Sequence, residues 1–147
     1  MEYLRRAVEL SQKSFDAGEF PAGAVLVTKG GTVYESSPSL PYNHGEMMVL
    51  DAAIKNEGFP LTGAMLYASM QPCLMCTSKI YWAGLTTVHY VIPKSKTNQT
   101  YAYENTMDTV EVARSFFKPV TFIHEPTHLL EALSIYERWI RAVEKKN

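Results

Sequence analysis

The spacing of apolar residues along the chain predicts five helices. In each of five segments, apolar side chains recur every three or four residues and therefore lie on one face of a helix. Gly18, Gly58 and Gly84 follow three of these segments, as expected where a helix ends. The predicted helices cover residues 2–17, 44–57, 73–82, 107–117 and 127–145.

Between the helices, runs rich in β-branched and aromatic residues predict five short strands. The first two strands flank Lys29-Gly30-Gly31, a glycine-rich turn that joins them as a hairpin. After the hairpin, strands and helices alternate. This order is typical of α/β domains with helices on both faces of a largely parallel sheet. The predicted strands cover residues 24–28, 32–34, 64–69, 88–92 and 120–123.

The connection between the last two strands decides how they pair. It is long enough to contain a helix, so we expect parallel strands, since a tight hairpin is excluded. The pattern therefore predicts an α/β fold, a three-layer α/β/α sandwich around a mixed five-stranded sheet whose last two strands are parallel. A chain of 147 residues is expected to form one domain, residues 1–147, with a core that needs no disulfides.

Composition and charge narrow the functional classes. The formal net charge is −1, whereas a protein that clamps a long nucleic acid usually carries a basic excess. The chain has two cysteines, too few for a disulfide framework, which favours a reducing compartment. Neither a signal peptide nor a membrane-spanning stretch is recognisable, so we expect a cytoplasmic protein with no membrane partner.

Two short motifs carry the candidate chemistry. His44-Gly45-Glu46 presents an imidazole and a carboxylate two residues apart, and Pro72-Cys73-Leu74-Met75-Cys76 presents two thiols three residues apart. One nitrogen and two sulfur ligands suit Zn²⁺, and three protein ligands leave the fourth tetrahedral position open for water, as in catalytic zinc sites. Each motif opens a predicted helix after a strand, at the edge of an open sheet where ligands bind.

The residue types suit hydrolysis at a carbon that bears an amine. Cys73 and Cys76 share the first turn of a helix, whose N-terminus favours thiolates. Zinc held by such ligands lowers the pKa of water, and Glu46 is near enough to take the released proton and pass it to a departing amine. Attack of water on an amidine carbon followed by loss of ammonia is hydrolytic deamination. H-x-E followed by P-C-x-x-C is the signature of zinc deaminases of nucleobases.

Each motif also has a plainer interpretation. C-x-x-C alone occurs in structural zinc half-sites and in redox pairs, and a histidine with a nearby glutamate is common where a helix starts. A closed structural site would need a fourth ligand from His89, His124 or His128, which we expect instead to be ordinary structural or surface residues. The order of the motifs, the proline before the first cysteine and the preceding strands together favour the catalytic site.

With these motifs the chain resembles the cytidine/deoxycytidylate deaminase superfamily of zinc-dependent nucleobase deaminases. The segment Pro21–Val25 resembles the family's Pro-x-Gly-Ala-Val start of the first strand, whose backbone, here that of Ala24, lines the substrate pocket. The resemblance implies a cytidine deaminase-like fold, Zn²⁺ as cofactor and a homodimer. It also implies one proton shuttle, Glu46, and three zinc ligands, His44, Cys73 and Cys76.

Within the superfamily, Met75 and the run Ile80-Tyr81-Trp82-Ala83 resemble bacterial guanine deaminases. In those enzymes an acidic residue after the fourth strand reads the guanine edge, and Glu104 matches it. Parallel last strands are also a feature of the fungal cytosine and tRNA adenosine branches. The resemblance thus implies a small nucleobase, nucleoside or related amino-heterocycle as substrate, with guanine first and cytosine next.

The chain departs from the family pattern in three places. Gln71 stands where the family usually has Glu before Pro-Cys, which removes a charge next to the zinc. The loop before His44 lacks the family's Gly-x-Asn, and either Ser39 or Asn43 is expected to take over as hydrogen-bonding group to the base. Gly45 is shared with fungal cytosine deaminases and is counted among the substrate contacts.

Two alternatives to a small substrate follow from the same residues. One is a deaminase of adenosine or cytosine in tRNA or single-stranded nucleic acid, which would take an unpaired or flipped base and hold its neighbours with basic groups. The other, motivated by Gln71 and the missing asparagine, is a catalytically inactive zinc-binding scaffold. Among the aromatic residues, Phe116 and Trp139 are expected in the core, whereas Tyr101 and Tyr103 either stack on a base or face solvent.

Overall fold

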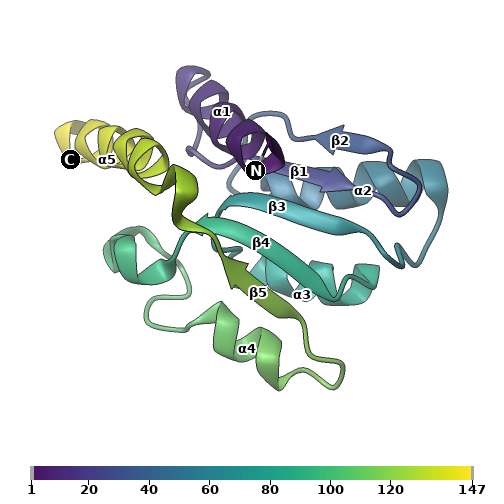
Figure 1. The fold of residues 1–147 in the computed structure, drawn as a ribbon. Coiled ribbons are helices and arrows are strands. Elements are labelled where there is room, and N and C mark those ends of the chain that lie inside the picture. The colour runs from purple at the N-terminus through teal and green to yellow at the C-terminus, as the bar shows by residue number, and fades with distance from the viewer. Residues whose placement is uncertain (1, 147) are drawn as a thin grey trace.

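A five-stranded sheet forms the centre of the computed structural model, which describes residues 2–146 (Figure 1). The strands are β1 (Ala24–Val27), β2 (Val33–Glu35), β3 (Met65–Met70), β4 (Thr87–Ile92) and β5 (Thr121–His124). They lie in the order β2-β1-β3-β4-β5. β1 pairs antiparallel with β2 and β3, whereas β3, β4 and β5 run parallel. The predicted mixed sheet and its parallel last strands are confirmed.

Within the described residues, five α-helices cover the two faces of the sheet. They are α1 (Glu2–Asp16), α2 (Gly45–Glu57), α3 (Leu74–Ala83), α4 (Thr109–Ser115) and α5 (Leu129–Lys146). α1 and α5 pack together on one face, while α2 and α3 cover the other, with α4 against α3 and β5 (Figure 1). The predicted three-layer sandwich is confirmed. None of the helices described is both long and apolar enough to cross a membrane.

Alternation along the strands divides the core into two layers. On β1, Ala24 and Leu26 join the layer under α2 and α3, whereas Val25 joins the layer under α1 and α5. On β3, Leu66 and Tyr67 divide in the same way. All five side chains are buried, because helices cover the sheet on both sides.

The segment predicted as a helix over residues 107–117 is shorter than expected. α4 begins after Asp108, whose side chain accepts a hydrogen bond from the Val110 N–H and caps the helix. Phe116 is already extended, and Phe117 is 90% exposed. The predicted ends are each two residues too far out, because capping and backbone geometry, which apolar spacing does not report, decide where a helix stops. The other predicted elements also begin and end within two residues of the observed ones.

The parallel strands β3 and β4 end at one edge of the sheet, where Met70 pairs with Ile92. α3 begins a few residues beyond the end of β3, and the short turns η1 (Lys94–Lys96) and η2 (Gln99–Tyr101) follow β4. The chain enters β1 at Gly23, where an added Cβ would overlap the backbone of α1. This edge therefore gathers helix starts and irregular loops, the arrangement in which open α/β sheets bind ligands.

Candidate active site

Three potential metal ligands converge where α2 and α3 begin. His44 is the residue before α2 and Cys73 the residue before α3, and Cys76 lies one turn into α3. His44 Nδ1 lies 3.3 Å from Cys73 Sγ and 3.6 Å from Cys76 Sγ, and the two sulfurs are 3.5 Å apart. Tetrahedral zinc with these ligands has edges of about 3.5–3.8 Å. The donor set therefore fits a shared zinc ion.

The other histidines do not join this group. Within residues 2–146, the imidazole and the two thiols are the one group of three donors close enough to hold a metal ion. His89 Nδ1 instead lies 2.5 Å from a carboxylate oxygen of Glu125. A fourth protein ligand from His89, His124 or His128, as the closed structural site requires, is not part of the arrangement.

The two thiol groups contact each other, with their sulfurs 3.5 Å apart. This contact lowers the pKa of Cys73 and raises the pKa of Cys76. The hydrogen bond to Cys73 also raises the pKa of His44. Cys73 Sγ accepts a hydrogen bond from the Cys76 backbone N–H at the start of α3. A dication between the sulfurs would favour two thiolates.

Glu46 is a buried carboxyl group on the same cavity wall. It is 3% exposed, and burial raises its pKa to about 7. A carboxyl group that titrates near neutral pH can both accept and donate a proton during a reaction. The position is set by α2, because Glu46 is its second residue and the next turn, with Val49 and Leu50, is anchored in the core.

A cavity of about 340 Å³ lies at this edge of the sheet. Small-molecule sites have volumes of ~300–1,000 Å³, so this cavity is at the small end of that range. His44, Glu46 and Cys73 line one part of it, and the segment after β4 lines another. A third part of its lining is aromatic and consists of Phe20, Tyr101, Tyr136 and Trp139.

The residues predicted to contact the substrate divide into two groups. Within residues 2–146, Ser39 and Glu104 line the cavity, whereas Ala24, Asn43 and Gly45 do not. Ala24 is fully buried and its N–H donates to Ser36 Oγ, and Gly45 packs against the same serine. Asn43 forms a backbone bridge with Leu40. Contacts of Ala24, Asn43 and Gly45 with a substrate stay predictions.

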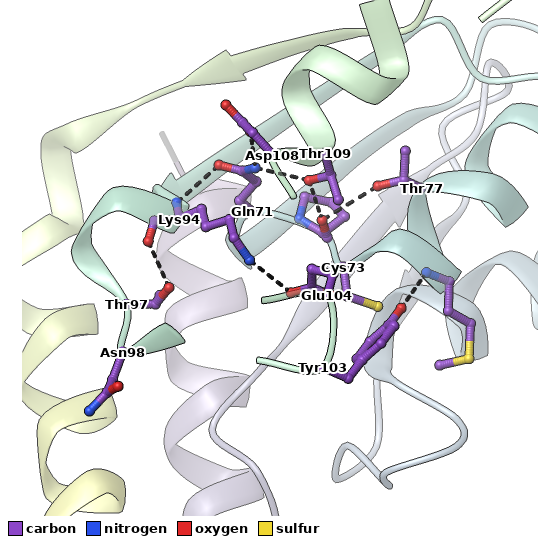
Figure 2. Close-up of polar contacts among 12 residues, drawn as sticks. Gln71, Cys73, Thr77, Lys94, Thr97, Asn98, Tyr103, Glu104, Asp108 and Thr109 are labelled. Carbon is purple, nitrogen blue, oxygen red and sulfur yellow. Dashed lines mark hydrogen bonds and ion pairs between the residues drawn. The ribbon is translucent and has the colours of Figure 1, made fainter. Parts of the chain in front are cut away.

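The loop wall of the cavity, defined as Lys94, Tyr103 and Glu104, contains a buried ion pair (Figure 2). Lys94 Nζ lies 3.2 Å from Glu104 Oε1, and both side chains are about nine-tenths buried. Tyr103 accepts a hydrogen bond of 2.7 Å from the Met75 N–H at the start of α3. Sequence reasoning missed Lys94, although its position just past the end of β4 is a signal for a ligand-binding edge.

Among residues 2–146, the hydrogen bonds of the Gln71 side chain do not include the thiols or the imidazole. Its side chain hydrogen-bonds the backbone of Lys94 and the side chains of Asp108 and Thr109 (Figure 2). The sequence suggested that an uncharged residue at position 71 would alter the surroundings of the zinc. In the structure Gln71 instead links the segments that contain Lys94 and Asp108.

The aromatic residues were only partly predicted. Phe116 packs against the core, as expected. Trp139 also packs on the core, but it stacks on Phe20 and lines the cavity. Tyr101 meets Trp139 edge-on, and Tyr103 is 63% exposed although it lines the cavity. The helical spacing of Trp139 predicted that it packs on the core, but not that it also lines the cavity.

Comparisons with known proteins agree with this geometry. Residues 1–92 match the sequence model of the cytidine and deoxycytidylate deaminase zinc-binding region. A guanine deaminase of Bacillus subtilis is 31% identical over 154 residues, which cover 98% of this chain and 96% of the relative. A tRNA-specific adenosine deaminase of the same organism is 34% identical over 84 residues, about half of each chain (53% and 52%).

The fold is also found in solved structures. A guanine deaminase from Nitrosomonas europaea superimposes with a TM-score of 0.74 at 13% identity, over 93% of this chain and 82% of that one. At such low identity the likeness concerns the fold alone. The family match over residues 1–92, together with the full-length relative and the three converging ligands, shows that the chain belongs to the cytidine and deoxycytidylate deaminase family and is a zinc-dependent deaminase.

Proposed function

We propose that this chain, as one zinc-dependent deaminase domain over residues 1–147, removes ammonia from a small free amino-heterocycle. Guanine-like substrates are preferred and cytosine comes next. One observation carries the proposal. Within the described residues, Oε2 of Glu104 is buried without a hydrogen-bond partner, in the same cavity lining as His44, Glu46 and Cys73.

A buried carboxylate oxygen without a partner is unfavourable, and a ligand that donates a hydrogen bond would satisfy it. Lys94 occupies only the other oxygen of Glu104. Guanine has a ring N–H beside the carbon that bears its amine, and free cytosine also has a ring N–H. Adenine has only acceptors on its pyrimidine-ring nitrogens. An acceptor at Glu104 therefore favours guanine-like rings over adenine.

The protein groups have separate roles in this proposal. His44, Cys73 and Cys76 hold zinc, which when bound supplies positive charge that lowers the pKa of water. Glu46 accepts a proton from that water and delivers it to a ring nitrogen next to the attacked carbon. It then carries a second proton to the departing amine. The balance is one water consumed and one ammonia released.

Ser39 supports recognition of a polar ring edge. It is 1% exposed and lines the cavity, and within residues 2–146 its hydroxyl has no hydrogen-bond partner. The backbone N–H of Ser39 is bonded to Ser14 Oγ, which holds the loop in place. The hydroxyl is thus free to donate to an oxygen or nitrogen of the substrate, the task predicted for it in place of the family asparagine.

Deamination of a base in tRNA is the second candidate. The similarity to a tRNA-specific adenosine deaminase favours it, as does Tyr103, an exposed aromatic residue on which a base can stack. The net charge of −1 speaks against it, since phosphate contacts require basic groups. Salt-sensitive binding of single-stranded RNA would favour this candidate.

We keep the homodimer as part of the proposal, and light scattering after size-exclusion chromatography tests it.

The deciding experiment measures ammonia release from guanine, cytosine, adenine, their nucleosides and azapurine analogues. We expect turnover of guanine or an analogue with a ring N–H, and none by the Glu46→Ala variant, whose zinc content should equal that of the unmodified protein. Turnover of adenine or adenosine alone would contradict the guanine-like assignment. Undiminished turnover by the variant would refute the role of Glu46.

A further inference from the structure

Gln71 connects both ends of the segment between β4 and α4. Its side-chain oxygen accepts a hydrogen bond from the Lys94 N–H at 3.0 Å, where the segment begins. Its side-chain nitrogen donates to Asp108 Oδ1 at 2.8 Å and to Thr109 Oγ1 at 2.9 Å, where the segment ends (Figure 2). One amide group thus spans the whole loop from its first residue to its last.

The loop between these ends carries the loop wall of the cavity. It contains two short 3₁₀ turns, and Glu104 lies between the second turn and α4. Inside the loop, Glu104 is held by Lys94, and Tyr103 is held by the Met75 N–H. Few apolar side chains anchor the segment, and within the loop the Asn98 N–H donates to the Tyr136 hydroxyl. The polar contacts at its two ends therefore contribute to where Glu104 lies.

We propose that Gln71 is a positioning residue for substrate recognition, which it serves by tying the two ends of the 94–108 loop together. A neutral amide suits this task because it accepts on one side and donates on the other. The inference rests on the proposed function only where it assigns Glu104 to substrate binding. That Gln71 holds the two ends of the loop together is argued from its hydrogen bonds alone.

A glutamate at position 71, the usual residue of the family, would fail in this chain. An ionised carboxylate has no donor, and here it would meet the carboxylate of Asp108. Thr109 Oγ1 already donates to the Pro72 carbonyl at 2.7 Å, so its proton is engaged. A glutamate would therefore lose two hydrogen bonds and add repulsion between like charges. Asp108 and Gln71 are suited to each other as a pair.

The test compares four zinc-loaded proteins: the unmodified chain, Gln71→Glu, Asp108→Asn and the double variant. Asp108→Asn keeps an acceptor for both Gln71 and the Val110 N–H, so it should behave like the unmodified chain. In the double variant the asparagine no longer repels the new carboxylate. Its amide nitrogen restores one hydrogen bond of the tie when it turns toward position 71, with loss of the cap on the Val110 N–H. Gln99→Glu, an exposed residue of the same loop, is the control for added charge.

Amide hydrogen exchange of residues 94–108 is the first measurement, because it needs no substrate. Gln71→Glu should speed this exchange about tenfold, as expected for the loss of hydrogen bonds to a charged partner, and the double variant should reverse part of the acceleration. Zinc content should stay at one per chain in all variants. Unchanged exchange in Gln71→Glu, exchange in the double variant as fast as in Gln71→Glu, or the same acceleration in Gln99→Glu would overturn the inference.

Steady-state kinetics on the base identified by ammonia release is the second measurement. Gln71→Glu should raise KM about tenfold with kcat within about threefold, since the acid–base machinery is untouched. A loss confined to kcat would overturn the role in recognition. If the unmodified protein releases ammonia from no base, the proposed function fails, whereas the exchange result and its reversal still decide whether Gln71 holds the loop.

Discussion

The two sides of the cavity differ in how they are built. The metal wall, defined as the lining residues His44, Glu46 and Cys73 together with the fully buried Cys76, lies at the starts of α2 and α3. Each of these helices is anchored by fully buried residues such as Leu50 and Ile80. The loop wall lies on an irregular segment held mainly by polar contacts.

On the proposed function, the catalytic groups and the groups that select the substrate lie on separate parts of the fold. Helices fixed in the core hold the groups proposed to move protons and bind metal within narrow limits, as catalysis requires. A loop can change its side chains without disturbing that arrangement, and binding residues are often found on such loops. We therefore expect changes in the metal wall to abolish turnover, and changes in the loop wall to alter preference among substrates.

Among the single substitutions, replacing Glu46 with Gln should have the largest effect. The amide preserves the shape of the side chain but cannot accept a proton, so turnover should fall by about 10²–10⁴-fold. Zinc content measured by atomic absorption should not change, since the three ligands are intact. Equal losses of zinc and activity would mean that the two roles within the metal wall are not separable.

Removal of zinc should stop turnover and also lower stability. The three ligands are held within 3.6 Å of one another, so a bound ion stabilises the folded state over the unfolded one. At free zinc of 100 to 1,000 times Kd this amounts to roughly 3–4 kcal/mol. Thermal unfolding with and without a chelator, followed by re-addition of zinc, measures it. His89→Gln should keep its zinc, and zinc loss there would point to a fourth ligand.

Replacing Glu104 with Gln should change preference and leave the metal wall intact. The amide oxygen can stay with Lys94 Nζ as a neutral partner, and the amide then places an NH₂ donor where the ring N–H of the substrate needs an acceptor. We expect kcat/KM for guanine-like rings to fall by about 10–100-fold, with unchanged zinc content. Glu111→Gln, on the exposed face of α4, is the matched control. A uniform loss for every base would show that Glu104 supports the fold and not recognition.

Ser39→Ala should have the smallest effect. Loss of one neutral hydrogen bond to the substrate corresponds to about a 2–10-fold increase in KM. The thermal midpoint should stay the same or rise slightly, because the change removes a buried hydroxyl without a partner within residues 2–146. Ser37→Ala, in the same loop but exposed, is the control for both measurements. A falling midpoint would instead indicate a structural role for the hydroxyl.

Local spacing in the sequence determined the metal centre and most of the fold. Cys73 and Cys76 are one helical turn apart, and each helix start follows from a short motif, so the donor types could be predicted without tertiary information. The alternation of buried residues along β1 and β3 likewise follows from the two-residue period of a strand. These features depend on neighbours within a few residues.

Only the tertiary structure decided which residues line the cavity. Lys94 and Glu104 lie in one irregular loop and Gln71 follows β3, without any shared period, and their contacts depend on the path of that loop. Conversely, Gly45 lies within the His44–Glu46 motif and Ala24 within the segment Pro21–Val25, yet both lie against Ser36 and neither lines the cavity. Distance along the chain says little about such positions, because long-range packing and hydrogen bonds bring the segments together.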